Sequence, residues 1–191
     1  MITAEPRRIL VLAGAAAHAS RTRSVAELVC RDVAAAGGRP VLRDLAEHPL
    51  PLLHADPDGA NLADVQIQAA EADAMIWVTP CYHGSYSGIL KNCLDHLRED
   101  ALRGKPVGVV AVGASLTAVS ACEHLRTVAR TLGCVTAPTQ AVVSGGGLAG
   151  DDGTDAGAYP RIIRMIGELH ALSGVTGLLR QCAAADAVSP A

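Results

Sequence analysis

Apolar and polar residues follow one another in blocks, and these blocks predict strands and helices in alternation. Continuous apolar runs, typical of strands buried on both faces of a parallel sheet, lie within residues 8–13, 74–79 and 107–112, and a second, short strand is predicted over residues 40–45. A fifth strand is predicted within residues 134–143, where Pro138 interrupts it. Apolar residues at helical spacing predict helices over residues 20–37, 61–71, 86–98, 116–132 and 161 to about 181. Gly174 and Gly177 are the places where the last helix could break.

This alternation predicts an α/β fold with a doubly wound parallel sheet of five strands and helices on both faces. Neither an internal repeat nor a linker divides the chain, so we expect one domain over residues 1–182 and a flexible tail over residues 183–191. In such sheets, ligands bind beyond the carboxyl ends of the strands. The loops after the first, third and fourth strands are therefore the candidate functional segments.

The amino-acid composition argues against nucleic acids and membranes as partners. The 191 residues contain no Phe, one Trp and three Tyr, so the core must be aliphatic and a base-stacking surface for nucleic acid is not expected. The net charge of −3 gives no basic field for a polyanion, and no apolar stretch reaches the roughly 18 residues of a membrane span.

The six cysteines stand singly without a C-x-x-C pair, which disfavours a structural metal site and fits a reduced, cytoplasmic protein. One alternative concerns the start of the chain. Arg7-Arg8, the apolar run and Ala17-His18-Ala19 together resemble a signal peptide. We favour a buried strand there, because strands and helices follow it in regular order.

The loop after the first strand changes from small residues to hydroxyl and guanidinium groups where the next helix begins. Ser20, Arg21, Thr22 and Arg23 fall at this point. A helix N-terminus offers free N–H groups and a positive dipole end, so these residues predict a phosphate cradle. The alternative is an ordinary N-cap at Ser20 with solvated arginines. The loop is neither a Walker A nor a G-x-G-x-x-G motif.

The loop after the third strand, residues 79–88, reads T-P-C-Y-H-G-S-Y-S-G. Three of the four aromatic residues, Trp77, Tyr82 and Tyr86, lie on or beside it, and its glycines let a planar group approach the backbone. Each tyrosine could stack on a substrate or pack the loop. Cys81 could be a reactive thiol or a small wall residue. His83 could contact a ligand or point into solvent.

Residues 79–97, T-P-C-Y-H-G-S-Y-S-G-I-L-K-N-C-L-D-H-L, resemble a signature of the NAD(P)H-dependent FMN reductase family, approximately T-P-x-Y-x-G-S-x-x-G-x-L-K-N-x-L-D. The first loop is similar to that family's phosphate loop, approximately G-S-x-R-x-x-S. The resemblance covers about residues 7–180. It implies a flavodoxin-like fold with strand order 2-1-3-4-5, one FMN per subunit, and NADPH or NADH as the hydride donor.

Carried over by position, the resemblance assigns the phosphate to Ser20 and Thr22, with Arg21 or Arg23 nearby. It assigns the edge of the isoalloxazine ring to Pro80, Cys81, Tyr82, His83, Gly84 and Ser85, and the other side of the ring to Gly113, Ala114 and Ser115. Ala15 and Ala17 depart from the phosphate pattern, and each removes a contact, so FMN is expected to bind loosely. His83 stands where the family frequently has Asn. No side chain is predicted as a catalytic acid or base.

The implied activity is hydride transfer from a nicotinamide to FMN, which supplies reduced flavin or reduces a second substrate in place. Alternatives are a tight-FMN reductase of quinones, azo dyes, nitro compounds or a metal oxyanion, and a flavin-binding module without turnover. A flavodoxin-like electron carrier and a signalling receiver domain are disfavoured, because this chain lacks the loop residues that each of those classes requires.

The resemblance also implies a homodimer or homotetramer, with interface pieces at residues 86–98 and 46–60. A flavin-dependent monooxygenase that receives reduced FMN is a further candidate partner. Lys91 and Asp95 are spaced for an i, i+4 ion pair or could lie at a subunit interface. Asp44 and Glu47 are expected to be solvated loop residues.

Overall fold

The centre of the molecule is a parallel sheet in the order β2-β1-β3-β4-β5, and β6 also pairs with β4, further along that strand than β5. The computed structural model describes residues 5–55, 60–113, 117–144 and 157–188, with side chains in the last range as far as residue 177. The strands are β1 (Arg8–Ala13), β2 (Arg39–Asp44), β3 (Ala74–Pro80), β4 (Pro106–Val112), β5 (Val135–Thr136) and β6 (Ala141–Val143). The predicted flavodoxin-like order is confirmed.

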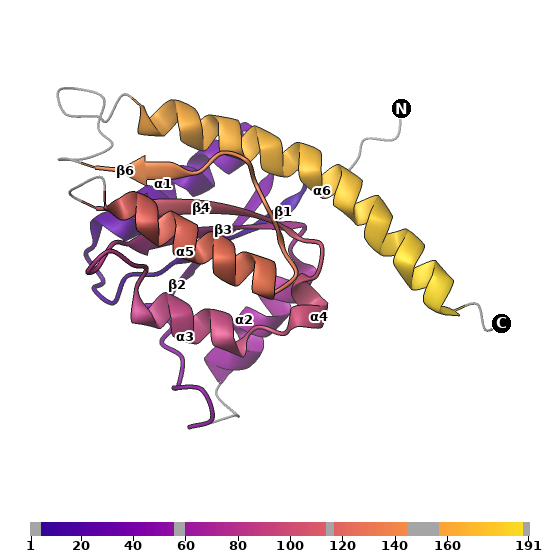
Figure 1. Ribbon diagram of the computed structural model, residues 1–191, viewed down its shortest axis with the longest axis horizontal. Helices are drawn as coiled ribbons and strands as arrows, with labels where there is room; N and C mark the ends of the chain where they lie inside the picture. Colours follow the sequence, from indigo (N-terminus) through magenta and orange to yellow (C-terminus); the bar gives the residue numbers. More distant parts are fainter. Residues whose placement is uncertain (1–4, 56–59, 114–116, 145–156, 189–191) are drawn as a thin grey trace.

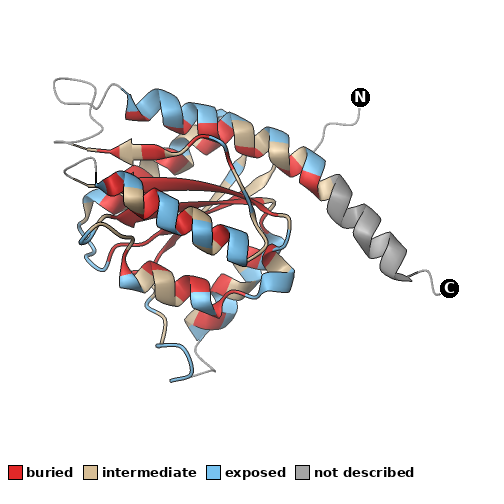
Figure 2. Cartoon of the chain, in the orientation of Figure 1, coloured by how far each residue is buried: buried red, intermediate tan, exposed pale blue. Residues whose placement is uncertain are grey.

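Helices cover both faces of the sheet (Figure 1). One face is covered by α1 (Arg21–Ala35) and α6 (Ala158–Val188), and the other by α2 (Ala60–Glu71), α3 (Gly88–His96), α4 (Glu99–Leu102) and α5 (Ala118–Thr131). Successive residues of each inner strand point to opposite faces of the sheet. In β1, Leu10 and Leu12 therefore point into the core under α2, α3 and α5, and Ile9 and Val11 point into the core under α1 and α6. Red bands of buried residues run along the inner strands in Figure 2.

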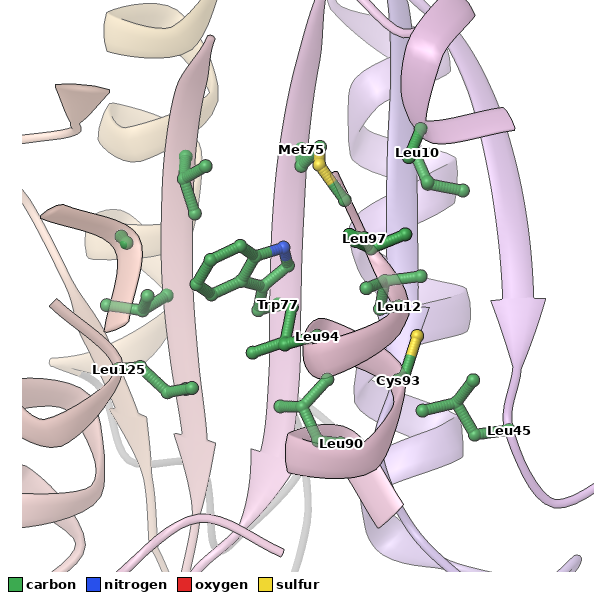
Figure 3. Close-up of a cluster of buried hydrophobic side chains, with 14 of the residues drawn as sticks. Leu10, Leu12, Leu45, Met75, Trp77, Leu90, Cys93, Leu94, Leu97 and Leu125 are labelled. Atoms are coloured by element: carbon green, nitrogen blue, oxygen red, sulfur yellow. The ribbon is translucent and has the colours of Figure 1, made fainter. Parts of the chain in front are cut away.

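The core on the α3 and α5 face is aliphatic apart from one ring. Trp77 is fully buried there, and Figure 3 shows its indole beside Leu94 and Met75. The expectation that Trp77 belongs to the aromatic group near the third loop is therefore wrong for its side chain. Its place in the middle of β3 directs it into the core, because strand side chains alternate between the faces.

The edge strand is divided, as the position of Pro138 predicted. Both β5 and β6 pair with β4, and two side chains hold the segment between them. From α5, Arg126 donates to the carbonyls of Ala137 and Pro138 at 2.8 and 3.0 Å. From α6, Glu168 accepts from the backbone N–H and hydroxyl of Thr139 at 2.8 and 2.6 Å. These side chains satisfy backbone groups that a ladder would otherwise satisfy.

The helices differ from the prediction mainly at α3, α4 and α6. Helix α3 begins at Gly88, because Ser87 caps it by accepting from the N–H of Leu90, and it ends at His96. The short helix α4 after it was not predicted. Helix α6 continues unbroken through Gly174 and Gly177 to Val188, beyond the predicted end and into the expected tail. Within the described residues, no helix has the length and apolar character that a membrane span requires.

Candidate functional site

Three loops meet at the carboxyl edge of the sheet, at the left of Figure 1. Backbone bonds extend the sheet into each of them. Gly14 donates to the carbonyl of Val78 at 2.8 Å, and Cys81 donates to the carbonyl of Val112 at 2.9 Å. Gly113 donates to the carbonyl of Val143 at 3.0 Å. The loops after β1, β3 and β4 are therefore adjacent, as a doubly wound sheet requires at its switch point.

The first loop ends in a helix N-terminus that is ready for an anion. Ser20 is the N-cap of α1, and its hydroxyl oxygen accepts from the N–H of Arg23 at 3.1 Å. The hydroxyl proton stays available to a ligand, as do the first-turn N–H groups of Arg21 and Thr22. The side chain of Arg21 is exposed, whereas Thr22 is buried. These groups can bind a phosphate through the backbone, one hydroxyl and one guanidinium.

Arg23 makes a different set of contacts. Its guanidinium donates to Glu27 at 3.0 Å and to Glu47, and it lies 3.2 Å from the carboxylate of Asp44. Glu47 is in the loop after β2, and its bond with Arg23 lowers the pKa of this carboxyl below the ordinary value. The expectation that Asp44 is a solvated loop residue is wrong, because Asp44 ends β2 and is 3% exposed.

The third loop is a two-residue hairpin. Tyr82 and Ser85 exchange backbone bonds of 2.9 and 3.0 Å, and His83 and Gly84 between them have φ of 50° and 79°. Left-handed conformation at both central positions defines a type I′ turn, which favours Asn-Gly. The Asn that the family frequently has at position 83 is thus a backbone preference, and His is among the residues that tolerate this conformation.

A buried polar network locks this hairpin to the first loop. The hydroxyl of Thr79 accepts from the N–H of Ser87 at 3.0 Å and donates to the carbonyl of Pro80 at 2.9 Å. The hydroxyl of Ser87 donates in turn to the carbonyl of Gly14. Thr79 and Ser87 are 0% and 3% exposed, so breaking this network would leave buried polar groups unsatisfied. A ligand that spans both loops would find them at a fixed separation.

Helix α5 forms the wall behind the hairpin. A Cβ added to Gly113 would lie 2.9 Å from the Cβ of Ala118 and 3.1 Å from that of Cys81, so only glycine fits. The thiol of Cys81 donates to the carbonyl of Thr117 at 3.7 Å. The resemblance also assigns the next two residues, Ala114 and Ser115, to the ring, but they lie outside the described residues.

His124 of α5 joins the site although sequence reasoning did not select it. Its Nδ1 and the hydroxyl of Ser85 share a hydrogen bond of 3.0 Å. Thr79, Ser87 and Asp44 were also missed as site residues. The hydroxyls of Thr79 and Ser87 lie within the recognised motif and could have been noticed, but only the packing of α5 reveals His124.

The two tyrosines of this loop have different environments. Tyr86 is half-buried and packs against the core, whereas Tyr82 is 54% exposed. Tyr82 can therefore stack on a planar molecule at the site, and Tyr86 shapes the loop.

Lys91 and Asp95 form the predicted ion pair along α3 at 2.5 Å.

The described part of the site matches the parts of a flavin mononucleotide and offers no metal cluster. The N-terminus of α1 suits a phosphate, and the hairpin and Gly113 leave backbone close to where a planar ring would lie. Among the described residues, no group of three or more His, Cys, Asp or Glu could hold a metal ion. Fold and site together define the class of flavodoxin-like flavin oxidoreductases.

Comparison with known proteins agrees with this class. The model of the family described as NADPH-dependent FMN reductase matches residues 7–148. The FMN-dependent NADPH-azoreductase of Staphylococcus aureus is 36% identical over 138 residues, which are 69% of this chain and 73% of that protein. The chain therefore belongs to the NADPH-dependent FMN reductase family.

Two solved structures are similar over most of the chain. An oxidoreductase from Corynebacterium diphtheriae has a TM-score of 0.71 at 27% identity, over 88% of this chain and 97% of that one. The apo form of an NADH:FMN oxidoreductase has a TM-score of 0.67 at 26% identity, over 85% of this chain and 88% of that one. This chain is accordingly an NAD(P)H-dependent FMN oxidoreductase by family.

Proposed function

We propose that the carboxyl edge of the sheet binds FMN with its phosphate at the N-terminus of α1 and its ring along the hairpin. Ser20, Arg21 and Thr22 would hold the phosphate through one hydroxyl, one guanidinium and the first-turn N–H groups. The hairpin residues 80–85 and Gly113 would line the ring. The buried bond from Ser87 to Gly14 carries this proposal, because it fixes the two loops relative to each other.

The protein's own contribution is positioning. When bound, FMN supplies the redox chemistry, taking a hydride from NADPH or NADH and delivering electrons to an acceptor. The left-handed hairpin and the wall of α5 would position a bound ring, while exposed Tyr82 would offer a face to a second planar molecule. An azo compound fits this surface, and the azoreductase relative supports the same acceptor class.

The first experiment measures NADPH and NADH oxidation by purified protein with FMN, with riboflavin and without added flavin. We expect oxidation to depend on flavin and to increase when an azo dye is added under anaerobic conditions. Replacing Tyr82 by Ala should raise KM for the dye by about five- to tenfold and weaken FMN binding less than this, since the lost stacking on the dye contributes about 1 kcal/mol. Absence of flavin-dependent oxidation with either coenzyme would refute the proposed function.

We further propose that the active form is a homodimer or homotetramer that uses the loop after β2. Leu52 and Leu53 in this loop are 73% and 41% exposed. The loop is held in place because Asn92 donates to the carbonyl of Pro51 at 2.8 Å and accepts from the N–H of Leu53. Exposed leucines on an anchored loop support a protein interface. Leu52→Asp should shift the mass measured by light scattering toward the monomer.

A further inference from the structure

Arg23 belongs to the helix turn proposed to hold the phosphate, but its guanidinium is bound by carboxylates. Arg23 is in the first turn of α1, and its N–H completes the cap with Ser20. Its Nε donates to Glu27, while its Nη1 contacts Glu47 and Asp44. The guanidinium of Arg23 therefore contacts three carboxylates at once, and these compete for its single positive charge.

The three carboxylates differ in how much they need Arg23. The side chain of Asp44 is 4% exposed and requires a cation, because a buried charge without a partner is costly. Those of Glu27 and Glu47 are 42% and 43% exposed, so water can solvate them. Glu47 shares Nη1 of Arg23 with Asp44, so removing its charge would leave Arg23 paired with the buried carboxylate and available to another anion.

A flavin phosphate at this helix terminus carries nearly two negative charges and would be a strong acceptor for Arg23. Resting on the FMN site proposed above, we infer that Glu47 competes with the phosphate of FMN for the guanidinium of Arg23 and so sets how tightly the protein holds its flavin. The phosphate then relies on Ser20, Arg21 and backbone N–H groups, and FMN exchanges readily. Riboflavin has the same ring without the phosphate, so its binding affinity should not depend on Glu47.

The test compares the dissociation constants of oxidised FMN and riboflavin, measured by quenching of flavin fluorescence without coenzyme or turnover. Glu47→Gln should tighten FMN by about tenfold, equivalent to about 1.4 kcal/mol, and change riboflavin by less than about twofold. Glu71→Gln is the matched control, because Glu71 pairs in the same way with Arg8 at the opposite edge of the sheet. This control should leave both constants unchanged.

A double variant identifies Arg23 as the group for which the anions compete. Adding Arg23→Gln to Glu47→Gln should abolish the gain for FMN, while unchanged riboflavin binding would show that the ring site is still folded. If the gain survives without Arg23, or if Glu47→Gln leaves the FMN-to-riboflavin ratio unchanged, the inference is wrong. If the wild-type protein binds neither flavin, the proposed function fails instead.

Discussion

At the residue scale, His83 tests whether the hairpin acts through its backbone. A β-branched residue at φ 50° costs roughly 1–3 kcal/mol, whereas Asn adopts this conformation readily. His83→Val should therefore lower thermal stability and weaken FMN binding, and His83→Asn should behave like the wild type in both measurements. If His83→Asn were as impaired as His83→Val, the imidazole itself would be needed and the backbone account would fail.

A substitution at Gly113 tests how closely the end of β4 approaches α5. A methyl group there would lie 2.9 Å from the Cβ of Ala118, so Gly113→Ala should destabilise the protein by about 1–3 kcal/mol in urea denaturation and weaken flavin binding. Gly167 in α6 is the matched control, because an added Cβ meets no atom within 4 Å. Gly167→Ala should stabilise the protein by about 0.5–1 kcal/mol, since Ala favours the helix.

The sequence predicted the motif residues of the site but could not predict their charge partners. Ser20 and the hairpin glycine could be recognised locally, because capping and left-handed turns depend on a few neighbouring residues. Arg23 meets Glu47 across 24 positions, and His124 meets Ser85 across 39. Such contacts depend on how loops and helices pack over the sheet, and a single sequence contains no periodic signal for them.

At the scale of elements, the divided edge strand depends on Arg126. This side chain also donates to the hydroxyl of Thr136 at 3.1 Å and to the side-chain carbonyl of Gln140. Arg126→Ala should lower the free energy of unfolding by about 1.5–3 kcal/mol, because it removes charge-assisted bonds to half-buried acceptors. Hydrogen exchange should accelerate most in residues 135–143.

The control for this variant lies one turn further along the same helix. Arg130 is exposed in the last turn of α5, so Arg130→Ala should change stability by no more than about 0.5 kcal/mol. Equal effects of the two variants, or exchange that accelerates evenly over all strands, would contradict the assigned role of Arg126.

The first four strands were predicted within one or two residues, and β1, β3 and β4 could be recognised because their apolar runs are continuous. Helix ends were less predictable. The hydroxyl of Ser87 sets the start of α3 through a cap, and α6 continues past two glycines because each costs only about 1 kcal/mol relative to Ala. Apolar spacing therefore predicts which elements exist, while capping and tertiary contacts decide where they end.

At the scale of the whole molecule, α6 docks against the N-terminal side of the sheet through His170. Its Cε1 is 3.0 Å from the position that a Cβ of Gly38 would occupy, and its buried Nε2 has no hydrogen-bond partner among the described residues. Burial, with a smaller contribution from the positive charge of Arg7, lowers the pKa of this imidazole below its ordinary value of 6.5. The folded protein therefore favours neutral His170.

This shift has a definite sign for stability against pH. Below about pH 6.5 the unfolded chain protonates this histidine before the folded chain does, so the free energy of unfolding should fall as pH falls toward the folded pKa. Above pH 6.5 the contribution is fully present. Urea denaturation between pH 7.5 and 5 should show a smaller loss for His170→Asn than for the wild type. An unchanged slope in His170→Asn would exclude this histidine as the cause.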